Sequence, residues 1–351
     1  MSLAAALRRH LLGPALFTLL CLALAGAYSW QASPSVPLLL GQLWVVVVLA
    51  VLEVSLSFDN AVVNAALLAD MDAVWRKRFL TWGMVFAVFG TRILFPLAIV
   101  GLSAGLDPVA AVRLSLTEPA RYEEIVTAAH LPIAGFGGAF LALVGLRFFL
   151  DQGKQRHWLR WLERPLHGLG RVEAAAIALV LAALLAGGAW LAPQDAHGWL
   201  TGGIVGIITF VLVEALGNLL GAGDGGHGAT VAVARSGLGA FLYLNVLDAS
   251  FSLDGVIGAF ALSNNMVIIA LGLSIGAAFV RALTLILVER DVLGQLVFLE
   301  HGAFWAILAL AGIMLSAPLV EVPESITGLV GAGLIAVAFW QSLRLRQRGG
   351  A

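Results

Sequence analysis

The feature that most constrains this chain is the recurrence of long apolar runs along its 351 residues. Runs of about 17 to 25 apolar residues match the length that an α-helix needs to cross a bilayer. Only 12% of the residues are charged, which is too few to cover the surface of a soluble domain. We therefore expect an all-α polytopic membrane protein with about 9–10 transmembrane helices. The candidate spans are residues 11–29, 38–58, 79–102, 131–150, 173–192, 200–220, 237–260, 266–288, 301–317 and 324–343.

Basic residues indicate on which side of the membrane each connecting segment lies. With the N-terminus in the cytoplasm, most of the 20 Lys and Arg residues fall in cytoplasmic segments, and only Arg113 and Arg121 fall in outer loops. This asymmetry follows the positive-inside rule and predicts that both termini are cytoplasmic. The first apolar run, which follows Arg8 and Arg9 and ends near the small residues 25–27, resembles both a signal anchor and a cleaved signal peptide. A net charge of −1 disfavours nucleic acid as a partner and leaves the lipid bilayer as the expected one.

An acidic motif occurs twice inside apolar runs. The two copies read Glu53-Val-Ser55-Leu-Ser57-Phe-Asp59-Asn60 and Asp248-Ala-Ser250-Phe-Ser252-Leu-Asp254-Gly255. The span after each copy carries one arginine, Arg92 or Arg281. The motif spans are the second and the seventh, so the two copies cross the membrane in opposite directions. This pattern predicts a 3+3 inverted-repeat core, in which transporters commonly bind their substrate at the repeat interface.

The repeat suggests how the chain is organised. No linker is long enough to separate soluble domains, so the boundaries are those of helix groups. We expect a signal-anchor or signal-like helix (1–37), a first repeat (38–150), a connector with two accessory helices (151–236), a second repeat (237–317) and a C-terminal helix with a basic tail (318–351).

Charged side chains inside a membrane are costly, so the motif residues must be paired or functional. Each Asp or Arg near the centre of a helix costs about 2.5–3.5 kcal/mol. One interpretation is a set of salt bridges between the acids and the two arginines that only holds the bundle together. An ion path is favoured, because the acids outnumber the arginines and hydroxyl groups add nothing to a salt bridge.

The spacing within one copy limits its geometry. The polar residues Glu53, Ser57, Asn60 and Asn64 fall on one helical stripe, whereas Asp59 lies about 120° from Glu53 around a straight helix. A straight helix cannot direct both acids at one ion. We therefore expect either local unwinding around the Ser-x-Ser stretch or two sub-sites in line along the path.

Further polar residues are weaker candidates. Glu214 and Asn218 form an i, i+4 pair in an apolar span, and they fit a site and an internal hydrogen-bonding pair equally well. Glu300 opens the ninth span and is a possible entry residue, although charge is ordinary at an interface. The glycine-rich loop around Asp224 matches Gly-x-Gly-Asp of intramembrane aspartyl proteases, but it also resembles a flexible turn.

Several classes of chemistry lack their motifs. The chain has no Walker sequence, no His-Glu-x-x-His and no Cys-x-x-Cys, and Cys21 is its only cysteine. We therefore expect a protein that is not an enzyme and has no tightly bound cofactor. Carboxylate, amide and hydroxyl oxygens would be the ligands, and these suit Mg²⁺, Ca²⁺ and Mn²⁺.

The two motif copies, together with Leu299-Glu300-His301-Gly302-Ala303, resemble signatures of the TerC/Alx integral membrane family, which belongs with the LysE-type transporter superfamily. The resemblance covers residues from about 40 to 315 and implies a bacterial inner-membrane protein. Members of that family are linked to manganese export and to tellurium-resistance phenotypes. Gly255 stands where the family commonly has a hydroxyl residue. The implied metal ligands are Glu53, Asp59, Asn60, Asp248 and Asp254.

These observations together predict a secondary transporter that exports a divalent cation, with Mn²⁺ favoured and with proton antiport as a chemically reasonable coupling. Arg92 and Arg281 would neutralise the acids when the metal leaves. Export of a small organic cation or an amino acid is the alternative within transport, and a protease that uses Asp224 is the alternative outside it. The supporting polar shell would comprise Ser55, Ser57, Ser250 and Ser252.

Overall fold

The computed structural model is helical throughout the residues that it describes, and this confirms the all-α polytopic fold class. The described residues are 3–69, 71–83, 85–151, 157–169, 174–221, 237–260, 262–289, 296–320 and 322–349. Six helices in this part of the chain are long and apolar enough to cross a membrane, as judged by length and composition. They are α1 (Leu3–Ala32), α2 (Val36–Leu56), α8 (His130–Leu150), α11 (Pro193–Gly221), α14 (Met266–Glu289) and α17 (Glu324–Gly349).

Three further predicted spans form helices with shorter apolar stretches. One of them, α13, carries the second acidic motif. The three helices are α10 (Ala175–Gly188), α13 (Leu238–Ala259) and α16 (Leu299–Leu315). A further helix, the amphipathic α9 (Arg160–Leu169), lies outside the predicted spans.

The span expected at 79–102 is not one regular helix. After the short helix α4 (Ala73–Arg78), the backbone forms the π-helical segments η1 (Phe79–Gly83) and η2 (Phe86–Leu94) and then α5 (Phe95–Ala104). The N–H of Phe95 bonds to the carbonyl of Gly90, five residues earlier, as in a π-helix. Pro96 has no N–H and lies in the first turn of the regular helix α5, and Gly105 caps the end of this helix in a left-handed conformation (φ 63°). Arg92 therefore projects from an irregular segment.

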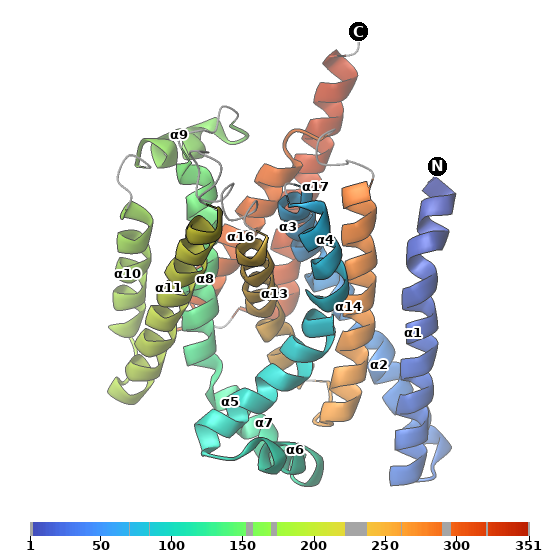
Figure 1. Ribbon diagram of the computed structural model, residues 1–351. Coiled ribbons are helices and arrows are strands. Elements are labelled where there is room, and N and C mark those ends of the chain that lie inside the picture. The colour runs from blue at the N-terminus through green and yellow to red at the C-terminus, as the bar shows by residue number, and fades with distance from the viewer. Residues whose placement is uncertain are drawn as a thin grey trace.

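The long outer loop contains two short helices, α6 (Pro108–Thr117) and α7 (Pro119–Ala128). Asp107 caps α6 by accepting hydrogen bonds from the backbone N–H groups of Val109 and Ala110, at 2.9 and 3.0 Å. In Figure 1, α5, α6 and α7 close one end of the bundle, which we call the capped end. Both chain termini lie at the other end, which we call the terminal end.

A largely apolar cluster joins α6 and α7 to the helices of the bundle. Tyr122 and Val126 from α7 belong to it together with side chains of α2, α13 and α14, and the ring of Tyr122 lies 6.2 Å from the ring of Phe260. We call it the capped-end cluster, and its buried members are Leu49, Val100, Ala111, Tyr122, Val126, Val256, Ala259, Phe260, Met266, Ile269 and Leu273.

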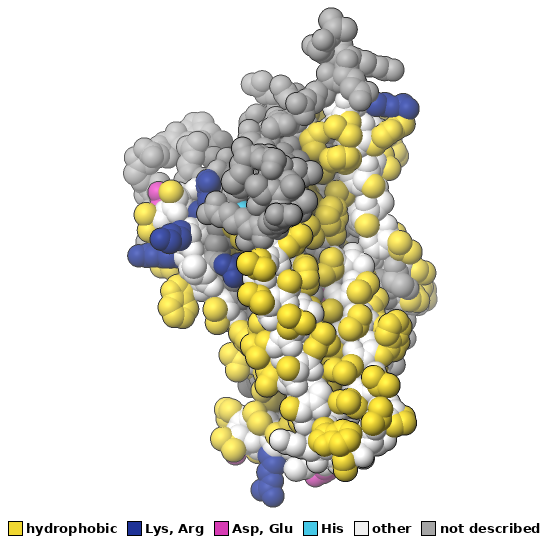
Figure 2. All heavy atoms as spheres, turned by 90° about the vertical axis from the view of Figure 1, so that its right-hand side faces the viewer, with side chains coloured by type: hydrophobic (Ala, Val, Ile, Leu, Met, Phe, Trp, Pro, Cys, Tyr) yellow, Lys and Arg dark blue, Asp and Glu magenta, His cyan; other side chains and the backbone are white. Residues whose placement is uncertain are grey.

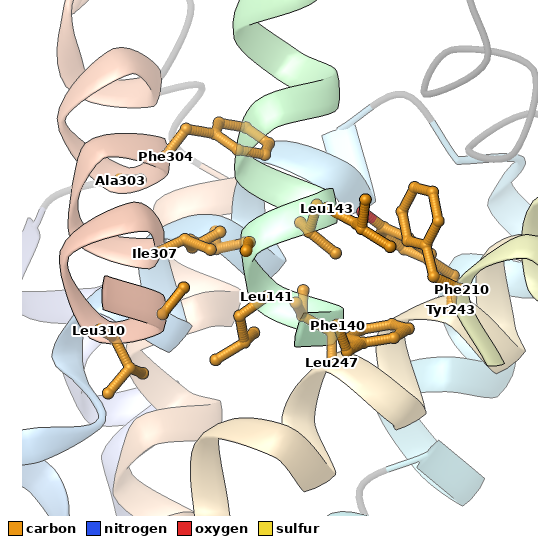
Figure 3. Packing of buried hydrophobic residues seen from close by; sticks show 14 of the residues in the cluster. Phe140, Leu141, Leu143, Phe210, Tyr243, Leu247, Ala303, Phe304, Ile307 and Leu310 are labelled. Carbon is orange, nitrogen blue, oxygen red and sulfur yellow. The ribbon is translucent and has the colours of Figure 1, made fainter. Parts of the chain in front are cut away.

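The main core surrounds α8, which is buried along most of its length. In Figure 3, Phe140 lies beside Phe210 and Tyr243, while Leu141 lies towards Ile307 and Leu310 of α16. Helices α8 and α11 pack backbone to backbone, since a Cβ atom at Gly202 would overlap the carbonyl oxygen of Pro132. The outer surface is apolar as well, and Figure 2 shows hydrophobic side chains over most of one face. A lipid environment is consistent with that surface.

Candidate functional site

The first motif copy interrupts its helix. Helix α2 ends at Leu56, Ser57 has φ −98° and ψ 16°, and α3 (Phe58–Ala69) begins directly after it. The hydroxyl of Ser57 donates a hydrogen bond to Oε1 of Glu53 at 2.9 Å. The second copy contains no such break, because α13 continues through residues 248–254. The local interruption expected from the spacing is therefore present in one copy only.

Glu53 forms a buried ion pair with Arg92. The guanidinium of Arg92 on η2 contacts Oε1 of Glu53 on α2, and the two side chains are only 2% and 3% exposed. A second guanidinium nitrogen of Arg92 donates to the hydroxyl of Thr91 at 3.1 Å. Ser57 and Arg92 thus share the same carboxylate oxygen, while Oε2 of Glu53 faces Gly255, where an added Cβ would lie 3.3 Å away.

Asp248 lies beside this ion pair and joins the two motif copies. Asn60 on α3 donates from Nδ2 to Oδ1 of Asp248 on α13 at 2.5 Å. The Asp248 carboxylate also interacts with the side chain of Asn64, and it lies within Coulombic range of both Arg92 and Glu53. Side chains from α2, α3, α13 and η2 therefore form one buried group, the central cluster, consisting of Glu53, Ser57, Asn60, Asn64, Arg92 and Asp248.

Glycines allow the surrounding helices to approach Glu53. A Cβ atom at Gly276 of α14 would overlap Cβ and Cγ of Glu53 and would lie 2.9 Å from the carbonyl oxygen of Ala50. Gly272, one turn earlier, lies equally close to Leu49. Because α14 has no side chain at these positions, its backbone packs directly on α2 and excludes water from one side of the carboxylate.

The other predicted site residues lie outside the central cluster or have side chains that the structure does not describe. The hydroxyls of Ser55 and Ser250 donate to backbone carbonyls four residues earlier, those of Val51 and Val246, at 2.8 and 2.9 Å. Arg281 lies half-buried on α14. The side chains of Asp59, Asn218, Ser252 and Asp254 lie outside the described residues.

The described side chains offer oxygen ligands without a dense acidic cage. Among them, no three His, Cys, Asp or Glu residues gather closely enough to hold a metal ion. The central cluster instead combines the two carboxylates of Glu53 and Asp248 with amides and one hydroxyl. Carboxylate, amide and hydroxyl oxygens are the ligands of hard divalent cations, which keep part of their water shell when few protein ligands are present.

Two weaker candidates lie elsewhere. Glu214 on α11 forms a salt bridge with Arg147 on α8 at 2.7 Å. Glu300 lies exposed in the first turn of α16. Asp224, the residue of the protease alternative, lies outside the described residues.

Comparison with known families gives one match. Residues 58–349 match a family model described as "Protein of unknown function (DUF475)". The chain belongs to the DUF475 family. The match includes Asn60, Arg92 and Asp248, and it begins directly after Ser57. No curated protein and no solved structure matches this DUF475 chain. The resemblance to the TerC/Alx family remains a prediction.

The structure of this DUF475 protein also places beside Asp248 two polar residues that were not among the predicted site residues, although Asn64 was on the predicted polar stripe. Asn64 and Asn245 lie buried next to Asp248, on α3 and α13. Their spacing was a usable signal, because Asn64 follows Asn60 by four residues and Asn245 precedes Asp248 by three.

A separate buried carboxylate, Glu163 of α9, lies at the terminal end. It accepts hydrogen bonds from the indole N–H of Trp305 and the backbone N–H of Trp158, and His157 and His301 also contact it. The helical spacing of α9 gave no indication of this cluster, because its members come from distant parts of the sequence. Trp158 also donates from its indole to Gln341 of α17 at 2.6 Å, so these contacts dock α9 onto two helices of the bundle.

Proposed function

We propose that this DUF475 protein is a secondary transporter that exports a divalent cation, with Mn²⁺ as the favoured cargo, across a bacterial inner membrane. The hydrogen bond between Asn60 and Asp248 supports the proposal most directly. It brings the two acidic motif copies together inside a bundle that exposes many hydrophobic side chains on the face shown in Figure 2. An ionisable residue inside a membrane-spanning segment indicates a functional site by default, because inserting its charge into the bilayer costs free energy.

The charges of the central cluster fit a divalent cation. Glu53 and Asp248 bring two carboxyl groups together, and Arg92 pairs with that of Glu53 in the arrangement described. Movement of the guanidinium away from Glu53 would leave two carboxylates for a doubly charged ion. Return of the guanidinium would weaken the hold on the ion, so Arg92 provides a means of release.

The surroundings of the cluster fit alternating access. Towards the capped end, the apolar side chains of Leu49, Val256 and Leu273 belong to a closed cluster. Towards the terminal end, the amides of Asn64 and Asn245 continue the polar row. The terminal end also carries the basic residues of α4 and α9, so the positive-inside rule predicts that it is cytoplasmic. A path that is polar on the cytoplasmic side and sealed on the other suits export.

The helix packing agrees with a 3+3 inverted repeat. Helix α2, which carries Glu53, packs on α14, which carries Arg281. In the corresponding contact, α13, which carries Asp248, packs on η2, which carries Arg92. Each motif helix thus contacts the arginine-bearing segment of the other half, as expected for two halves related by a pseudo-two-fold axis.

Mn²⁺ accumulation in cells that lack their own exporters tests the proposal. We expect the unmodified chain to lower cellular Mn²⁺, and we expect Glu53→Gln and Asp248→Asn to abolish this effect at matched membrane expression. Ser55→Ala is the matched control, because the hydroxyl of Ser55 is exposed and bonds to its own helix. Equal Mn²⁺ levels in cells with the unmodified chain and cells with an empty vector would exclude manganese as the cargo. Asp59→Asn and Asp254→Asn extend the series to the outer acid of each motif.

Export of a small amino acid is the second candidate, and the buried Glu53–Arg92 pair favours it. A guanidinium binds a carboxylate well, and a nearby carboxylate binds an ammonium group, so the pair is complementary to a zwitterion. Efflux of labelled amino acids from proteoliposomes separates the two candidates. Amino-acid efflux that persists after chelation of divalent cations would favour the second candidate over the first.

A further inference from the structure

Two asparagines lie next to Asp248 in the interior of the bundle. Asn64 on α3 is 5% exposed and Asn245 on α13 is 7% exposed. Asn64 interacts with the Asp248 carboxylate. Asn245 precedes Asp248 by three residues on α13, so both amides lie on the side of the helix that carries this acid.

The carbonyl oxygens of these two amides are buried without a hydrogen-bond donor among the residues that the structure describes. Asn245 uses its Nδ2 group to donate to the backbone carbonyl of Phe241 at 2.6 Å, which leaves Oδ1 available. A buried amide oxygen without a donor costs free energy, and leucine has a similar volume without that cost. Two such oxygens beside one carboxylate therefore indicate a ligand.

The position of the pair relates it to the path through the membrane. Helix α3 runs towards the terminal end and α13 begins there (Figure 1). Asn64 lies one turn beyond Asn60, and Asn245 lies about one turn before Asp248. Both amides are therefore nearer to the terminal end than the Asn60–Asp248 bond, by about 5 Å at 1.5 Å per residue.

We propose that Asn64 and Asn245 form a second, neutral subsite for the cation between Asp248 and the terminal end. This inference rests on the proposed transport of divalent cations. Amide oxygens are ligands of hard cations, and Mg²⁺-like ions lose their water reluctantly. Two neutral oxygens would replace part of the water shell before the ion reaches the carboxylates. Because they carry no charge, they would hold the ion weakly enough to pass it on, as a multi-site path requires.

Uptake of Mn²⁺ into liposomes that contain the purified full-length protein and an Mn²⁺-sensitive dye tests this subsite. We expect Asn64→Leu and Asn245→Leu each to slow uptake by about tenfold, which corresponds to about 1.4 kcal/mol. Equilibrium Mn²⁺ binding, measured by electron paramagnetic resonance, should change by less than about threefold, because Glu53 and Asp248 remain. The unfolding temperature is measured alongside, because each leucine also removes a hydrogen bond, the one between Asn64 and the Asp248 carboxylate or the one from Asn245 to the carbonyl of Phe241.

Thr284→Ala is the matched control for the leucine variants. Thr284 is a buried polar residue on α14 whose hydroxyl donates to the carbonyl of Val280 in its own helix, at 3.1 Å. Uptake should therefore continue at nearly the unmodified rate. If both leucine variants also transport within about twofold of the unmodified rate, the subsite is excluded and the carbonyls bind only ordered water.

If the leucine variants do not fold, a variant with an added carboxylate tests the subsite instead. Asn245→Asp replaces a neutral ligand with a carboxylate, so we expect Mn²⁺ to bind about tenfold more tightly and to be released more slowly. Unchanged Mn²⁺ affinity in this variant would overturn the inference while the proposed function stands. Failure of the unmodified protein to move any divalent cation would instead overturn the proposed function, and the subsite with it.

Discussion

Asn60 donates a hydrogen bond of 2.5 Å to Asp248, although 188 positions separate the two residues in the sequence. This bond joins α3 to α13 and lies beside the ion pair between Glu53 and Arg92. Two acidic motifs that are far apart in the chain thus form one buried cluster.

Removal of one partner from the Glu53–Arg92 pair should destabilise the protein strongly. Arg92→Leu leaves the Glu53 carboxylate buried without its guanidinium, and a change of this kind costs about 3–5 kcal/mol. The double variant Glu53→Gln with Arg92→Leu should recover much of that loss, because no charge remains unpaired. Thermal unfolding of the purified variants in detergent measures the coupling, and additive effects of the two substitutions would contradict the buried pair.

Gly276→Ala should displace Glu53 and reduce transport. The added Cβ overlaps the side chain of Glu53, so α14 must move away from α2 and the unfolding temperature should fall. Gly333→Ala on α17 is the control, since a Cβ there meets nothing within 4 Å and alanine is the better helix former by about 0.5–1 kcal/mol. A Gly276→Ala protein with unchanged stability and unchanged transport would show that α14 does not pack closely on α2.

Tyr122 should make the docking of α7 sensitive to alkaline pH. Its hydroxyl is buried without a hydrogen-bond partner among the described residues, and burial raises the pKa of Tyr122 above its ordinary value of 10.0. A group whose pKa is raised in the folded state stabilises the fold fully below the pKa of the unfolded state, so stability should decline as the pH rises above about 10. Tyr122→Phe should reduce this decline.

The size of the Tyr122 ring should matter more than its hydroxyl. Tyr122→Ala leaves a cavity in the capped-end cluster, and the loss of a buried aromatic ring costs about 3–5 kcal/mol. Unfolding temperatures of the alanine and phenylalanine variants at several pH values measure both effects. Equal stability of the two variants at pH 7 would contradict a packed capped-end cluster.

Glu163→Gln should loosen α9 from the bundle without abolishing transport. The carboxylate accepts hydrogen bonds from the Trp305 indole and the backbone N–H of Trp158, and hydrogen bonds to a charged group contribute about 1.5–3 kcal/mol each. Hydrogen exchange should therefore accelerate in α9 relative to the unmodified protein. Arg160→Ala is the control on the same helix, because Arg160 is exposed. Unchanged exchange in the glutamine variant would show that Glu163 does not dock α9.

The amino-acid sequence by itself determined the class of this protein. Apolar runs such as 131–150 and 266–288 predicted α8 and α14 to within about one residue at each end, because the length and composition of a span are local properties. The cost of charge in a membrane marked Glu53 and Asp248 as residues that must be paired or functional, and both lie in the central cluster. The break at Ser57 was one of two geometries that the motif spacing allowed.

Only the tertiary structure decided which polar groups meet. Arg92 reaches Glu53 from the π-helical segment η2, and neither that backbone form nor the approach of α14 at Gly276 follows from hydropathy. Ser55 and Ser57 occupy similar places in the motif but have different partners, because α2 ends between them. The hydroxyl of Ser57 donates to the carboxylate of Glu53, whereas that of Ser55 donates to a backbone carbonyl. Contacts such as Asn60–Asp248 depend on how distant helices pack, and packing is a property of the whole bundle rather than of any one segment.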